Sequence, residues 1–216
     1  MKNEMKKTVN KILCVLLLAV MLFTLLPAFA ALTANAAEIV ASGYCGGEGD
    51  GTNLSWTVDS DGLVTISGEG PMQDFGYYDV VWRSSSSFDS RVKAVVVEEG
   101  VTSIGAYAFH ECRALASVSL PDSLTLIGNS AFSCCLALQE ITIPEQVADI
   151  GDSAFASCES LTAVTIPGSV KTIGNIAFSH CRSLQTLTLN DGLERLGGTA
   201  FGYCTSPPSA TATRWA

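Results

Sequence analysis

The sequence predicts an α/β repeat solenoid, in which short structural units stack one on the next. Three residue types recur with a step of 23 residues over five units, and no insertion breaks the step. The recurring positions are Gly105, Gly128, Gly151, Gly174 and Gly197; Phe109, Phe132, Phe155, Phe178 and Phe201; and Cys112, Cys135, Cys158, Cys181 and Cys204. Self-similarity at a fixed period of about 20–50 residues is typical of repeat architectures, because each unit buries its apolar face only against its neighbours.

Residues 1–36 are predicted to be a secretory signal peptide. Lysines precede a mostly apolar run from Ile12 to Leu26, and Ala34-Asn35-Ala36 has the small-x-small pattern of a signal peptidase site. A membrane anchor is the alternative, but the run would reach only about 22 Å, short of a hydrocarbon core of about 30 Å. We therefore expect a secreted chain, extracellular or at a cell surface, with no membrane insertion after cleavage.

Residues 37–91 are predicted to form a β-rich capping module. Apolar and polar residues alternate in residues 54–58 and again in residues 64–67. The intervening Asp59-Ser60-Asp61-Gly62 has the composition of a tight turn, so the two runs predict a β-hairpin that caps the first coil. The same four residues offer oxygen ligands, but they lack the spacing and the terminal glutamate of a calcium loop.

Residues 92–204 are predicted to form the repeat array, and the first half of each unit is predicted to be a strand. In residues 115–121 the apolar side chains alternate with serines, which is strand periodicity. Proline has no N–H for the ladder and ends the strand in three units, at Pro121, Pro144 and Pro167. One such strand per unit predicts a parallel β-sheet along one face.

The second half of each unit is predicted to be a short helix or 3₁₀ turn. In residues 127–138 five apolar positions fall at offsets 0, 4, 5, 8 and 11, which fits one helical face. Asn129, Asp152 and Asn175 stand where an N-cap oxygen would accept the first free amides of such a helix. Coils about 4.8 Å apart would align the five phenylalanines into a buried ladder.

The unit resembles the BspA-type leucine-rich repeat of secreted and surface proteins of bacteria, L-x-x-V-x-I-P-x-x-V-x-x-I-G-x-x-A-F-x-x-C. Residues 161–178 follow this pattern closely, and the resemblance extends over residues 42–204. It implies a leucine-rich repeat fold and a role in adhesion or protein binding at a cell surface. It implies no catalytic chemistry.

Residues 205–216 are predicted to be a disordered or truncated tail. A leucine is expected three residues after Cys204, but Pro207 stands there and is followed by Pro208. We recognise no repeat phase in residues 209–216. The last coil is therefore expected to fray.

Composition and charge exclude several functional classes. Only 15% of the residues are charged and 48% are hydrophobic, which argues against intrinsic disorder. The net charge of -9 argues against nucleic-acid binding, which takes clustered lysine and arginine. His110 and His180 occupy different repeat phases and are expected at the surface, so they predict no zinc site. We expect no cofactor and no metal.

The five repeated cysteines are predicted to be a buried row of free thiols, because cysteine packs well as a small apolar group. Bridges between adjacent coils are the alternative, since secretion favours disulfides. Cys134 lies outside this row and is expected to face solvent, and the state of Cys45 stays open.

The concave face of the sheet is the predicted binding surface. Its outward positions form two rows of small, mostly polar side chains: Ser117, Glu140, Ala163 and Thr186, and beside them Ser119, Thr142, Thr165 and Thr188. The alternative is a solvated row that merely suits strand pairing. The predicted function is a non-catalytic interaction or adhesion module for a protein or glycan on a host or bacterial surface. The alternative function is the repeat arm of a larger extracellular enzyme.

Overall fold

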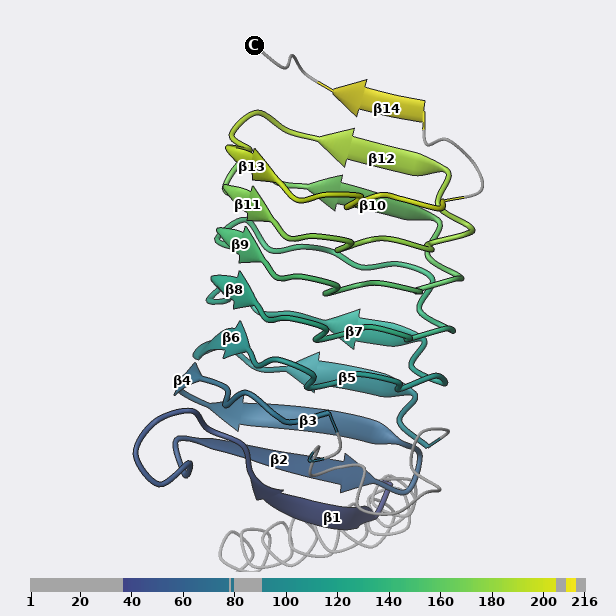
Figure 1. Ribbon diagram of the computed structural model, residues 1–216. Helices are drawn as coiled ribbons and strands as arrows, with labels where there is room; N and C mark the ends of the chain where they lie inside the picture. The colour runs from purple at the N-terminus through teal and green to yellow at the C-terminus, as the bar shows by residue number, and fades with distance from the viewer. Residues whose placement is uncertain (1–36, 78, 80–90, 205–208, 213–216) are drawn as a thin grey trace, which may run out of the picture. The chain divides into compact units, whose positions relative to one another are not determined.

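The computed structural model describes residues 37–77, 79, 91–204 and 209–212, and the predicted signal peptide lies outside the described residues. The chain divides into two compact units, Met1–Glu38 and Ile39–Ala216. Every strand assigned in the described residues belongs to the second unit, which is a stack of coils with strands along each of two sides (Figure 1).

The first sheet begins as an antiparallel meander and continues into the array. Strands β1 (Ile39–Tyr44), β2 (Leu54–Asp59) and β3 (Leu63–Gly68) pair antiparallel. Strand β3 then pairs parallel with β5 (Ala94–Val97), and β5 pairs parallel with β7 (Ser117–Ser119). The predicted hairpin is therefore present as β2 and β3, and it is continuous with the sheet of the array. Its role as a cap stays a prediction.

The second sheet consists of short parallel strands, one per coil. They are β4 (Gly70–Pro71), β6 (Val101–Ile104), β8 (Leu126–Ile127), β9 (Asp149–Ile150), β11 (Thr172–Ile173) and β13 (Arg195–Leu196). The sheet order β13-β11-β9-β8-β6-β4 is unbroken. This sheet contains the residues at which the short helices were expected to begin, and it leaves the apolar isoleucines 104, 127, 150 and 173 buried.

Turns stand where short helices or 3₁₀ turns were predicted, and no α-helix or 3₁₀-helix is assigned in the described residues. Each unit has two residues with positive φ that an α-helix does not accommodate, such as Ser130 (φ 53°) and Cys134 (φ 61°). The backbone amides of Ser130 and Phe132 donate to the backbone carbonyl oxygens of Asp152 and Ala154 in the next coil. The apolar offsets fit a chain of turns as well as a helix, and the hydrogen bonds between coils decide for the turns.

The asparagine and aspartate positions link coils and do not cap helices. The amide of Asp152 donates to Oδ1 of Asn129 at 2.8 Å, and the amide of Asn175 donates to Oδ1 of Asp152 at 2.6 Å. Oδ1 of Asn175 accepts the amide of Gly198 at 2.8 Å. Each side chain thus satisfies the backbone of the equivalent position one repeat later.

The core is built around the predicted phenylalanine ladder. Phe109, Phe132, Phe155 and Phe178 are fully buried. Their rings stack with centroids 5.0–5.3 Å apart and interplanar angles of 9–12°. Phe201 continues the stack at 5.2 Å from Phe178 but is only half-buried. The ladder prediction is therefore confirmed.

Part of the segment that was expected to be disordered is a strand. Strand β14 (Ser209–Ala212) pairs parallel with β12 (Thr186–Leu189), and Thr186 faces Ser209 in a step of 23 residues. The repeat register thus continues through residues where no repeat phase was recognised. A parallel ladder uses backbone N–H and C=O groups, so the register persists although Pro207 replaces the expected leucine.

Candidate binding face

The side chains of the predicted binding face lie together on the first side of the array. Seven of the eight are exposed, and Thr188 at the end of the second row is half-buried. The pairing of β10 (Ala163–Ile166) with β12 sets Ala163 beside Thr186 and Thr165 beside Thr188. The alternating apolar residues of these strands, such as Val164 and Leu187, point into the core. The strand periodicity is therefore confirmed for β7, β10 and β12, while the role of the face in binding stays a prediction.

The face also extends onto the meander, which the sequence did not reveal. Thr57 of β2 pairs with Thr65 of β3, and Thr65 pairs with Val96 of β5. Val96 in turn lies beside Ser119. Alternation placed each threonine on the outward side of its own strand, but only the parallel pairing of β3 with β5 joins them to the repeat rows.

The sheet on this side is interrupted at the third coil of the array, which contains residues 140–143 and β9. Strands β1-β2-β3-β5-β7 form one sheet and β10-β12-β14 form another, with residues 140–143 between them. These residues form no strand, and a single bridge joins Glu140 to Ala163. Figure 1 accordingly shows no arrow between β7 and β10. The second sheet stays continuous across the same coils through β8 and β9.

A shallow groove of about 310 Å³ lies where the third and fourth coils meet on this face. Its lining combines two glutamates, two threonines, an alanine and an aliphatic floor: Glu140, Ile141, Thr142, Ile143, Glu145, Ala163, Val164, Thr165 and Pro167. Four of the predicted face residues therefore line one hollow. Sequence reasoning did not place Glu145 or Pro167 on the face, since both come after the alternating segments from which the face was predicted.

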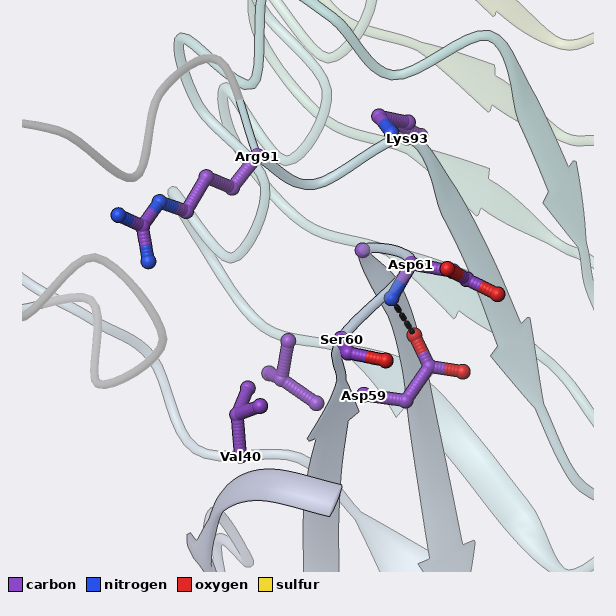
Figure 2. Close-up of a pocket in the computed structure, with 8 residues that line it drawn as sticks. Val40, Asp59, Ser60, Asp61, Arg91 and Lys93 are labelled. Atoms are coloured by element: carbon purple, nitrogen blue, oxygen red, sulfur yellow. Dashed lines mark hydrogen bonds between the residues drawn. The ribbon is translucent and has the colours of Figure 1, made fainter. Parts of the chain in front are cut away.

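A second pocket of about 400 Å³ lies at the hairpin turn (Figure 2). Asp59, Asp61, Arg91 and Lys93 contribute charged side chains to its lining. Oδ1 of Asp59 accepts the amides of Asp61 and Leu63, each at 2.9 Å, so this carboxylate holds its own turn. Figure 2 shows the Arg91 side chain extending away from the two aspartates. These contacts support the turn interpretation of residues 59–62.

The two histidines differ in their environments. His110 is only 6% exposed, so the expectation of a surface side chain was wrong for this residue. Its ring lies 4.7 Å from that of Tyr77 and 5.6 Å from that of Tyr107. His180 is half-buried and stacks on Tyr203 at 4.7 Å. In the part of the chain that the structure describes, no three metal-ligating side chains come together.

The repeated cysteines form a row of thiols that share no disulfide, as predicted. Cys112, Cys135, Cys158 and Cys181 are fully buried. From Cys135 onward each Sγ donates to the carbonyl of the phenylalanine 26 residues earlier, for example Cys158 to Phe132 at 3.3 Å. Burial raises the pKa of Cys181 to about 12. Cys134 is half-buried and not fully in solvent, and Cys45 is buried, with a pKa that burial raises to about 12.

Comparison with protein families accounts for the repeat. Residues 84–207 match the model of the BspA type leucine rich repeat region, in six copies. The chain belongs to this family. The match spans more than half of the 216 residues and covers every coil of the array.

Solved structures of bacterial leucine-rich repeat proteins share the fold. A protein from Bacteroides ovatus is 30% identical with a TM-score of 0.52, over 70% of this chain and 44% of its own. A protein from Eubacterium ventriosum is 23% identical with a TM-score of 0.53, over 69% and 44% of the two chains. A leucine-rich cell surface protein from Faecalibacterium prausnitzii is 24% identical with a TM-score of 0.53, over 76% and 54%. The chain thus spans about half the length of these structures. The comparison with curated proteins gave no match.

In the residues that the structure describes, we find no helix with the length and apolar character needed to traverse a bilayer.

Proposed function

We propose that this leucine-rich repeat protein is a secreted or surface-displayed, non-catalytic module that mediates adhesion or protein–protein interaction through the face defined by Ser117, Ser119, Glu140, Thr142, Ala163, Thr165, Thr186 and Thr188. In this proposal residues 1–36 direct secretion, residues 37–91 cap the array, and residues 92–204 present the face. The ligand is a protein or glycan on a host or bacterial surface.

The observation that carries the proposal is the double row of mostly exposed side chains, which alternate with buried residues along the chain. The core holds these side chains at a fixed spacing, so a partner meets a rigid surface and little conformational entropy is lost on binding. The rows are small and lack the aromatic anchors that dominate strong interfaces. One copy should therefore bind weakly, and display of many copies should strengthen binding by avidity.

The test places arginine at Thr142 and Thr165, which are exposed and adjacent in the second row. We expect T142R/T165R to abolish binding of the multimerised protein to cells or matrix, because two long cations cover the centre of the face. The melting temperature should change little, since both side chains face solvent. Binding is measured by surface plasmon resonance or flow cytometry on a panel of host and bacterial surfaces.

The matched control is L126R/L196R, which adds the same two charges to the second sheet. Leu126 and Leu196 are 40% and 42% exposed, so arginine is tolerated there too. Undiminished binding by T142R/T165R, or equal loss in both variants, would move the site off the proposed face. Turnover of a substrate by the purified chain would reject the non-catalytic role.

A further inference from the structure

The groove at the third coil differs in charge from the rest of the face. Its two ionisable lining residues are Glu140 and Glu145, and both are exposed. The remaining lining is uncharged, with hydroxyl groups from Thr142 and Thr165 and an aliphatic floor. No lysine or arginine lines the groove, so its own residues offer these carboxylates no cation within it.

The turns beside the groove add to its negative potential. Glu99, Asp122, Glu145 and Asp191 repeat at the step of 23 residues, with Gly168 in the place between the last two, and all four acidic residues are exposed. The Glu99 carboxylate accepts the amides of Asp122 and Ser123 in the next coil, at 2.9 and 3.2 Å. Stacked carboxylates along one edge of the strands attract cationic ligands and repel anionic ones.

Lys171 of the following coil makes its contacts away from the groove. Nζ of Lys171 donates to the carbonyl of Gly192 at 3.2 Å and lies 3.7 Å from Oε1 of Glu194. Both contacts hold it toward the next turn along the array. Neither contact of Lys171 involves a residue that lines the groove, so the groove keeps its negative character.

We propose that this groove binds an extended segment of a partner protein that carries lysine or arginine. The inference rests on the proposed function and names the chemistry of its partner. In an extended segment alternate side chains point the same way, so a cationic head can reach Glu140 or Glu145 while its methylene stem lies over Val164 and Pro167. The partner backbone meets residues 140–143 at the place where they form no strand of their own.

Other occupants fit the groove less well. A second copy of this chain carries the same net charge of -9 and is repelled. An anionic glycan or a phospholipid surface meets the same repulsion. Shallow depth and mixed lining also suit a peptide better than a small apolar ligand, which needs an enclosed pocket.

The experiment measures binding of a fluorescein-labelled peptide of alternating lysine and valine by fluorescence anisotropy at low ionic strength, with an alternating glutamate–valine peptide as the charge control. The variant E140Q/E145Q removes both charges without changing side-chain size. We expect it to bind the lysine peptide about fivefold more weakly, the effect of losing two exposed ion pairs. Binding by the wild type should weaken as salt is added.

The matched control variant is E48Q/D149N, which removes two exposed carboxylates outside the groove, one in the loop between β1 and β2 and one on β9 of the second sheet. It should change the affinity for the lysine peptide less than about twofold. Equal loss in both variants, equal binding of the two peptides, or no binding of the lysine peptide would overturn the inference. If E140Q/E145Q binds normally while T142R/T165R loses surface binding, the face is retained and only the cationic partner is rejected.

Discussion

Truncation of Phe155 tests whether the ring ladder carries the stability of the array. Phe155 is fully buried, and its ring stacks on Phe132 at 5.3 Å and on Phe178 at 5.0 Å. Phe155→Ala loses the transfer free energy of the ring and leaves a cavity, which together cost about 3–5 kcal/mol. The free energy of unfolding of a natural domain is about 5–15 kcal/mol, so Phe155→Ala should be only marginally stable.

The expected magnitude depends on the position in the ladder. Phe201 is half-buried at the end of the stack and lies against Phe178, so Phe201→Ala should cost about 2 kcal/mol. The backbone hydrogen bond from Phe155 to Ala177 does not need the ring and should persist in Phe155→Ala.

The assay is equilibrium urea denaturation followed by far-ultraviolet circular dichroism on the wild type, Phe155→Ala, Phe155→Leu and Phe201→Ala. Phe155→Leu keeps an apolar side chain of moderate size and should fall between the wild type and the alanine variant. The reasoning is refuted if Phe155→Ala unfolds at the wild-type midpoint, or if it costs no more than Phe201→Ala.

Three further predictions concern the backbone and the thiols. Ile176 has a φ of 50° and is 41% exposed, so Ile176→Asn should raise the free energy of unfolding by about 1 kcal/mol, and a lower urea midpoint would contradict this. Asp152→Ala removes the acceptor of the Asn175 amide and should lower the free energy of unfolding by about 1 kcal/mol, whereas Asp152→Asn should lower it little. Equal losses in urea denaturation would show that the Asp152 side chain does not link the two coils. Burial raises the pKa of Cys181 from 9.0 to about 12, so its contribution to stability is full below pH 9 and is lost as the pH rises toward 12. Native alkylation at pH 8, read by mass spectrometry, should label Cys134 before Cys181; the reverse order would contradict the burial.

Much of the architecture follows from the sequence because it rests on side chains that recur at a fixed step. Alternation in residues 115–121 identifies a strand with one buried and one exposed side, and the structure places Ser117 and Ser119 in solvent. The 23-residue step of phenylalanine is sufficient to predict the stacked rings, since equivalent residues of equivalent coils must lie above one another. The exposed rows of the candidate face follow from the same two patterns.

Only the tertiary structure decided how the second half of each unit folds and where the face is hollowed. Apolar offsets of 0, 4, 5, 8 and 11 describe a buried side, and a helix and a chain of turns both satisfy them. The choice depends on hydrogen bonds between coils, such as Ser130 to Asp152, which join residues about one repeat apart and leave no local signal. The sequence of residues 140–143 alternates like its neighbours, yet these residues form no strand, because pairing depends on the backbones of both adjacent coils. The burial of His110 likewise depends on Tyr77, which comes from a segment before the array and meets the histidine only in the folded chain.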